Sequence, residues 1–125
     1  MSHISILKTR LTDKTILIEA LEALGYEVTE GENLIISGAN RKTKVDFQIA
    51  VPWSDPIGFR SGKNGYQIVA DWFKIQLDRK QFQDRLLQQY AYVAVKKSVS
   101  AQGFSVVQEE TSQDNRIHLV FRRNG

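Results

Sequence analysis

The spacing of hydrophobic residues along the chain alternates between the period of a strand and the period of a helix. Residues 4–11 are rich in β-branched and apolar side chains, which predicts a strand. A cap at Thr12-Asp13 and leucines at helical spacing then predict a short helix that ends at Gly25. The leucines are Leu17, Leu21 and Leu24.

A hairpin and a longer strand are predicted next. Residues 26–29 alternate, residues 30–33 have turn chemistry and residues 34–37 are apolar again, which indicates a hairpin. The clearest alternation in the chain follows and predicts a strand with one face in the core and one in water. Its core-facing residues are Val45, Phe47, Ile49 and Val51.

The interval 52–65 is expected to be a long irregular loop, because it holds both prolines and three glycines as well as Trp53 and Phe59. Loops of this length are often functional. Its end, residues 61–65, reads Ser-Gly-Lys-Asn-Gly, which could form a small anion nest. The spacing is not that of a phosphate-binding loop and no helix follows directly, so a hairpin turn is the favoured interpretation.

The second half of the chain repeats the order of the first. Residues 66–72 alternate as a strand, and Asp78 with Gln81 resembles the capping box of a helix of about 24 residues. After Gly103, residues 104–107 and 116–122 predict a closing hairpin around residues 109–115. Each half is therefore a strand, a helix and a hairpin.

The sequence predicts a single α+β domain over residues 1–125, with two layers. Neither half could bury its apolar faces alone, so we expect the two to join edge to edge in one mostly antiparallel sheet with two helices on one face. Two explanations of the repeated order stay open. The halves are pseudo-symmetric strand–helix–hairpin units, or the similarity is chance, because glycine and an aromatic residue after a helix are common.

Composition removes several kinds of chemistry. The 125 residues are 42% hydrophobic and 25% charged, with no cysteine. This excludes disulfides, thiol catalysis and cysteine-ligated metal sites. The net charge is +3: residues 1–62 hold seven Lys/Arg and eight Asp/Glu, and residues 63–125 hold ten and six. No apolar run is long enough to span a membrane and no secretory signal is visible, so we expect a protein that stays inside the cell or organelle.

Several motifs in order carry a resemblance to a known family. They are Met1-Ser2-His3, Leu24-Gly25-Tyr26-Glu27-Val28, Ile57-Gly58-Phe59, Tyr66-Gln67-Ile68-Val69-Ala70-Asp71-Trp72, Gln89-Tyr90-Ala91-Tyr92, Gln102-Gly103-Phe104 and Ile117-His118-Leu119-Val120-Phe121-Arg122-Arg123. Together they resemble the uncharacterised domain family numbered 1257, which includes the conserved chloroplast open reading frame thirty-five proteins of plastids and cyanobacteria. The chain departs from the family at residues 52–56 and at its end. The resemblance implies a plastid-stromal or cyanobacterial cytoplasmic protein and no established activity.

Candidate catalytic residues are sparse. Acid–base chemistry would need two carboxylates in different environments, and Asp46 and Asp71 are the best candidates. Solvation, or pairing with Arg60 or Arg116, is the favoured explanation of both residues. Neither His3 nor His118 has the context of a catalytic triad. Two isolated histidines give no metal-ligand cluster, so we expect neither a metal nor a cofactor.

Two main classes of function remain. A non-enzymatic protein-binding or adaptor module would use the loop from Trp53 to Phe59 or a polar reverse face of the sheet, and it is the favoured class. The residues expected on that face are Asp46, Gln48, Gln67, Arg116 and His118. The alternative is a small-ligand or enzymatic pocket near Phe59, Arg60, Asp71 and Trp72.

A nucleic-acid binder is a weaker third class. Its basic pairs, such as Lys96-Lys97 and Arg122-Arg123, are spread along the chain and interrupted by acids. We therefore expect an unidentified protein partner rather than nucleic acid. The sequence leaves the oligomeric state open, a homo-oligomer included.

Overall fold

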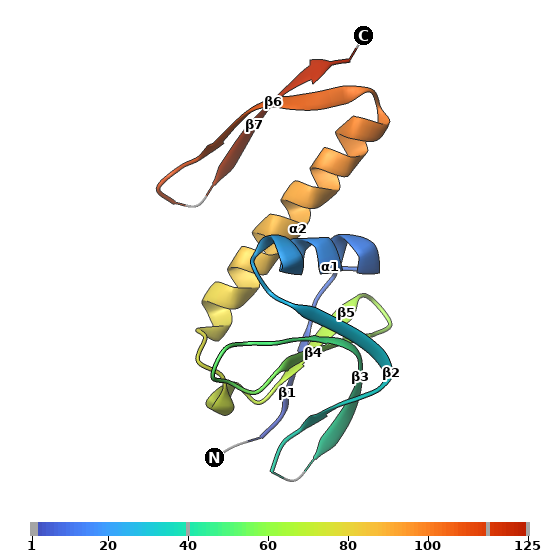
Figure 1. Cartoon of the computed structure of the whole chain (residues 1–125), viewed down its shortest axis with the longest axis vertical. Coiled ribbons are helices and arrows are strands. Elements are labelled where there is room, and N and C mark those ends of the chain that lie inside the picture. Colours follow the sequence, from blue (N-terminus) through green and yellow to red (C-terminus); the bar gives the residue numbers. More distant parts are fainter. Residues whose placement is uncertain (1–2, 40, 115, 125) are drawn as a thin grey trace.

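The computed structural model describes residues 3–39, 41–114 and 116–124, which form an α+β fold. An antiparallel five-stranded sheet has the order β1-β5-β4-β3-β2, and β6 and β7 form a separate two-stranded sheet (Figure 1). The strands are β1 (Ser5–Lys8), β2 (Val28–Ser37), β3 (Lys42–Ile49), β4 (Ile57–Ser61), β5 (Tyr66–Ala70), β6 (Phe104–Thr111) and β7 (Ile117–Arg123). The helices are α1 (Lys14–Ala23), the short 3₁₀ helix η1 (Trp72–Lys74) and α2 (Arg79–Ala101).

Both helices begin where the sequence predicts. The Asp13 carboxylate accepts a hydrogen bond from the Ile16 amide (3.0 Å), and the Asp78 carboxylate accepts one from the Gln81 amide (2.8 Å). These caps satisfy amide groups that have no partner within the helix. Gly25 follows α1 with a φ of 94°, the left-handed conformation that glycine adopts without a steric cost.

One hydrophobic core lies between the helices and one face of the five-stranded sheet. From the sheet it takes Phe47, Ile49, Phe59, Ile68 and Ala70, and from the helices Leu17, Ala20, Leu21, Phe82, Leu86 and Val93. Phe47 and Phe59 stack with their ring centroids 5.0 Å apart. The predicted fold class is thus confirmed: a mostly antiparallel sheet with two helices on one face.

The strand boundaries correct two predictions. The interval 52–65 is not one irregular loop, because β4 occupies its middle and the Gly62 amide bonds to the Gly65 carbonyl oxygen in the predicted hairpin turn (3.0 Å). Residues 30–33 are not a turn between strands. They lie inside β2, as a local break in its register with β3 between Glu30 and Leu34. Glycine and charged residues mark a strand irregularity as readily as a turn.

Only part of the reverse face of the sheet is the wet polar surface that we expect from the sequence: Asp46 is exposed and Gln48 and Gln67 are half-buried, but another part is covered. Ile4, Ile36, Val45 and Val69 form a second buried cluster there. Gly58 explains how it closes: a Cβ at this position would lie 2.6 Å from both Ile36 Cγ1 and Val45 Cγ1. Only glycine lets the far half of the β2–β3 hairpin pack this closely on β4.

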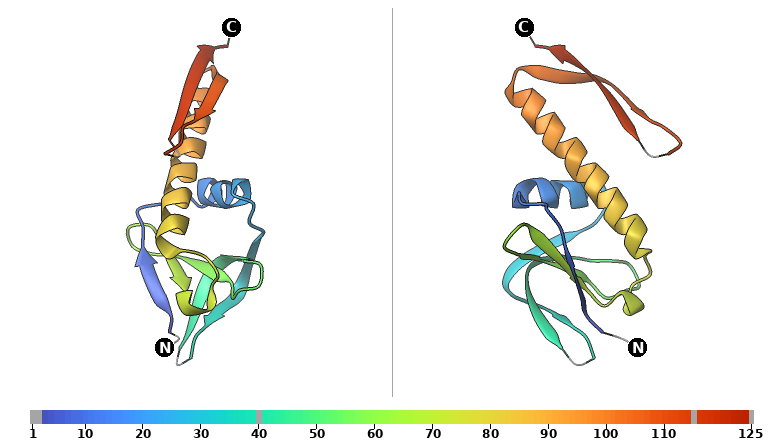
Figure 2. Two further views of the ribbon diagram at one scale, coloured as in Figure 1. Left: turned by 90° about the vertical axis from the view of Figure 1, so that its left-hand side faces the viewer. Right: turned by 180° about the vertical axis from the view of Figure 1, so that it is seen from behind.

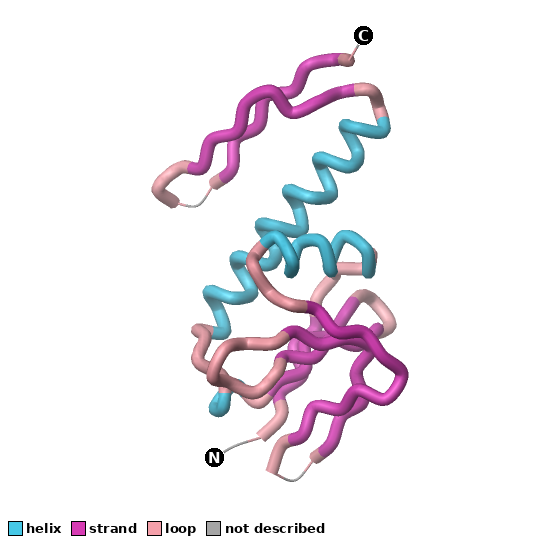
Figure 3. Tube along the Cα trace, viewed as in Figure 1, coloured by secondary structure: helices cyan, strands magenta, loops and turns pink. Residues whose placement is uncertain are grey.

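The C-terminal hairpin of β6 and β7 does not join the main sheet, which corrects the expectation of a single edge-to-edge sheet. It lies at the far end of α2 (Figure 2), and the strands fall into two separate groups (Figure 3). At about 1.5 Å per residue, the 23 residues of α2 span about 35 Å and carry the hairpin away from the core. The order strand, helix, hairpin does recur in both halves. Asn115 of the predicted C-terminal turn, and Met1 and Ser2 of the first motif, lie outside the described residues.

Candidate functional site

Two loop segments that lie far apart in the sequence are joined at one end of the main sheet. We call residues 51–56 and 71–76 together the aromatic tip. The Asp55 amide donates to the Lys74 carbonyl oxygen (3.2 Å), and the Gln76 amide donates to Ser54 Oγ (2.8 Å). Val51 and Ile75 are buried in the core beneath them. The tip is therefore a bonded unit with a hydrophobic anchor on each segment.

Trp53 stands out from the tip in an unfavourable backbone conformation. Its φ is 61°, and the Ser54 amide closes the turn by donating to the Val51 carbonyl oxygen (3.1 Å). Proline at the second position and a positive φ at the third are typical of a type II turn, where glycine is preferred. The side chain is 93% exposed, so packing within the chain does not offset the steric cost of about 1 kcal/mol.

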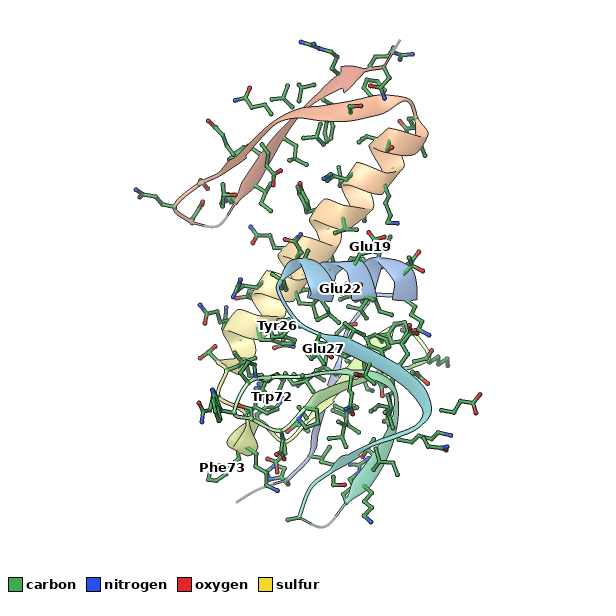
Figure 4. The ribbon with its side chains drawn as sticks, in the orientation of Figure 1. Glu19, Glu22, Tyr26, Glu27, Trp72 and Phe73 are labelled. Carbon is green, nitrogen blue, oxygen red and sulfur yellow. The ribbon has the colours of Figure 1, made fainter. Side chains whose placement is uncertain are left out.

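Phe73 is the second exposed aromatic residue of the tip, at 77% exposure. It lies in η1, whose first turn is capped by Asp71. The Asp71 carboxylate is 1% exposed and accepts a hydrogen bond from the Phe73 amide (3.3 Å). Figure 4 shows Phe73 at the outer side of this turn. Asp71, predicted as a candidate acid or base, thus fixes the backbone that presents Phe73.

Trp72, also a predicted site residue, points the other way. Its ring lies 5.9 Å from that of Phe82 of α2, and it packs against the core. Its indole Nε1 is buried without a hydrogen-bond partner. The two successive residues therefore have different roles: Trp72 anchors the segment to the core, and Phe73 faces solvent.

The pocket predicted around Asp71 is not assembled. Phe59 is completely buried in the core, stacked on Phe47. Arg60 pairs with Gln67 across the β4–β5 hairpin, and its Nε donates to Gln67 Oε1 (2.7 Å). Asp71 is four residues beyond Gln67, about 13 Å along an extended chain. The structure therefore does not bring the acid, the base and the aromatic ring of that prediction together.

Asp46 and His118 lie elsewhere. The exposed Asp46 accepts a hydrogen bond from the Ser61 amide (2.7 Å), where β3 parts from β4. Ser61 pairs with Tyr66 at the start of β5, whereas Asp71 follows the end of β5, so the two aspartates occupy opposite ends of that strand. His118 is exposed on β7, opposite Glu110. Of the predicted residues, the tip unites only Trp53, Asp71 and Trp72.

Charged groups surround Asp46 in an open depression. Lys14 Nζ lies 2.7 Å from Glu30 Oε1, and both groups also line the depression with Tyr66. Burial raises the pKa of Tyr66, and the nearby Lys14 ammonium opposes this rise. An exposed ion pair of this kind stabilises the protein little. Among the residues that the structure describes, no three His, Asp or Glu side chains gather as a metal site would require.

Sequence reasoning missed Phe73. The sequence does contain a signal for an exposed aromatic residue here, because the strand pattern of residues 66–70 is followed by two successive aromatic residues, Trp72 and Phe73. Neighbouring side chains in an extended segment point to opposite faces. If one of Trp72 and Phe73 enters the core, the other faces solvent. The preceding Asp71, a favoured residue before a helical turn, marks where the strand ends.

Comparison with known proteins identifies relatives over nearly the whole chain. The model of a family described as "Protein of unknown function (DUF1257)" matches residues 20–120. A protein of Pyropia yezoensis named "Uncharacterized protein ycf35" is 33% identical over 128 residues, and one of Cyanophora paradoxa with the same name is 29% identical over 125 residues. Each alignment covers 98% of both chains.

Solved structures and the helices of the chain add two further findings. No solved structure matches the chain. Within the described ranges, no helix is both long and apolar enough to cross a membrane. Because the family model covers most of the chain and the Pyropia protein matches nearly all of it, the chain belongs to the DUF1257 family.

Proposed function

We propose that this protein is a non-enzymatic protein-binding or adaptor module that contacts its partner through the aromatic tip. The observation that carries the proposal is Trp53, a 93% exposed tryptophan in a turn position that favours glycine. Backbone strain and solvent exposure both disfavour tryptophan there, and neither is offset within the chain. A partner that covers the indole would offset them.

The chemistry of the tip suits a protein partner. Tryptophan and other large aromatic side chains supply much of the binding energy at protein interfaces. Trp53 and Phe73 project from a unit that the Asp55–Lys74 and Gln76–Ser54 hydrogen bonds hold together. A preorganised surface loses little conformational entropy on binding. By resemblance to the family, the proposed setting is a plastid stroma or a cyanobacterial cytoplasm.

The test is affinity capture with the immobilised chain from plastid-stromal and cyanobacterial extracts, followed by binding measurements with the purified partner. We expect a stoichiometric protein partner, and we expect Trp53→Ala and Phe73→Ala each to weaken its binding about 30-fold, the effect of a hot-spot residue. Leu87→Ala is the control, because Leu87 is an exposed apolar residue on α2, away from the tip.

Thermal unfolding separates lost binding from lost folding. Trp53→Ala and Phe73→Ala should melt within a few degrees of the unmodified chain, because both side chains are exposed. Equal binding by the unmodified chain and by both variants would refute the aromatic tip as the binding surface. Capture of no partner even at low salt would refute the adaptor function.

A further inference from the structure

The described strands leave four sheet edges, at β1, β2, β6 and β7, and two of them, β2 and β7, have matching sequences. β2 is the last strand of the five-stranded sheet, and β7 is an outer strand of the two-stranded sheet. Each edge carries a large exposed apolar side chain: Ile35 on β2 is 50% exposed and Val120 on β7 is 47% exposed. An open strand edge with apolar residues is a template for pairing with another chain.

The β6–β7 hairpin also lacks the cover that a small sheet needs. A two-stranded hairpin is at best marginally stable in water. None of its described residues is fully buried. Its inner apolar side chains Ile117, Leu119 and Phe121 line an open groove of about 360 Å³ against α2. Adding a strand to its edge would extend both the hydrogen-bonded ladder and the apolar face.

The sequences of the two edges match in one antiparallel register. With Ile35 opposite Val120, Leu34 faces Phe121 and Ile36 faces Leu119. Past Leu34, in the irregular part of β2, the same register brings Glu32 near Arg123, an acid beside a base. A shift of one residue in either direction places a charged or histidine side chain opposite Leu34 or Ile36, and it inverts the faces.

We propose that β7 of one copy of this chain pairs antiparallel with β2 of a second copy, in that register. A second copy is the indicated occupant because both matching edges, with their opposite charges, belong to the same sequence. The chain cannot satisfy them internally, since α2 holds the hairpin at the far end of the molecule from β2 (Figure 1). Because each copy carries both edges, reciprocal pairing closes a two-fold dimer.

This inference goes beyond the proposed function and uses none of its residues. Trp53 and Phe73 lie on the loops after β3 and β5, neither of which is a sheet edge. The dimer would therefore display two copies of the aromatic tip. Loss of dimerisation and loss of partner binding can be measured separately on the same variants.

Engineered cysteines provide the first test, because the chain has no cysteine of its own. We expect an oxidised mixture of Ile35→Cys and Val120→Cys chains to form a disulfide between the two variants. An equal mixture of Ile35→Cys and Val107→Cys chains is the matched control, since Val107 is 49% exposed on β6 of the same hairpin. Cross-linking that is no faster with Val120→Cys than with Val107→Cys would overturn the proposed register.

Reversing the charge of Glu32 or of Arg123 provides the second test, and light scattering measures the molar mass of each variant. The unmodified chain should show twice the 14.3 kDa of one copy. Glu32→Lys and Arg123→Glu should each raise the dimer dissociation constant about tenfold, by placing like charges opposite each other at two symmetric sites. An equimolar mixture of these two variants restores both ion pairs, so it should again form dimers.

Light scattering would also reveal the results that contradict the proposed dimer. A mass of one copy for the unmodified chain at millimolar concentration would overturn the dimer. A stable dimer that neither charge variant weakens would overturn this pairing of β2 with β7. Both variants change exposed side chains, and circular dichroism should show that each retains its fold.

Discussion

The two hairpins β2–β3 and β6–β7 have similar local patterns and different positions in the fold. Both follow a helix, and in both apolar residues alternate with polar ones. In β3 every second side chain is buried, whereas no described side chain of β6 or β7 is. The first hairpin pairs with β4 and is covered by the helices, whereas the second forms a separate sheet that packs beside α2. Alternation thus predicts which face is apolar, and tertiary contacts decide whether that face is buried.

The largest expected effect is a difference in stability between two variants, one in the main core and one in the β6–β7 hairpin. Phe59→Ala removes a fully buried ring from the main core and should lower the free energy of unfolding by about 3–5 kcal/mol. Phe121→Ala removes a partly buried ring from the β6–β7 hairpin and should lower it by about 1 kcal/mol.

Urea titration followed by the circular dichroism of the chain measures both losses. The two unfolding midpoints should differ clearly, with the Phe121→Ala midpoint near that of the unmodified chain. Similar losses for Phe59→Ala and Phe121→Ala would mean that the hairpin shares the main core, contrary to this fold.

A smaller effect, of opposite sign, is expected at the aromatic tip of the main sheet. Trp53→Gly should raise the free energy of unfolding by up to about 1 kcal/mol, because glycine adopts a φ of 61° without a steric cost. Thermal unfolding, compared with that of Trp53→Ala, measures it, since alanine keeps the strain and lacks the ring. A Trp53→Gly chain that is less stable than Trp53→Ala would show that the turn is not strained.

The smallest effect concerns ionisation beside the main core. Burial raises the pKa of Tyr26 above its ordinary value of 10.0, while the Arg85 guanidinium partly opposes this. The folded state therefore holds its proton more tightly than the unfolded state, so the stabilisation is complete below about pH 10 and is lost as the pH rises through the folded-state pKa. Tyr26→Phe should make stability fall less between about pH 9 and about pH 11 in urea titrations. An unchanged pH dependence would contradict the role of Tyr26.

The sequence predicts most local structure of this chain, for identifiable reasons. Asp13, Asp78 and Gly25 act through neighbours within a few residues, so their roles at the helix ends can be deduced without the fold. The alternation of β3 and β5 is equally local. The place of the β6–β7 hairpin depends on the length and direction of α2, which no hydrophobic pattern within the hairpin encodes.

The candidate site was predictable only in part. A tryptophan after a proline in a loop makes Trp53 a candidate from the sequence, and the structure places its side chain in solvent. Phe59 was wrongly grouped with it, because the strand β4 inside the expected loop carries that ring into the core. Phe73 joins the tip through hydrogen bonds between segments about 20 residues apart, and such contacts leave no local signal.

Amide hydrogen exchange on the Glu32→Lys variant, at a concentration at which light scattering gives the mass of one copy, tests the contrast between the two regions most directly. Exchange rates report the free energy needed to open each hydrogen bond. We predict that the amides of β3 and β5 exchange only through global unfolding, while those of β6 and β7 exchange at least a hundredfold faster. Equal protection of the two sheets would contradict the account, because it would show that the C-terminal hairpin is part of the same cooperative core.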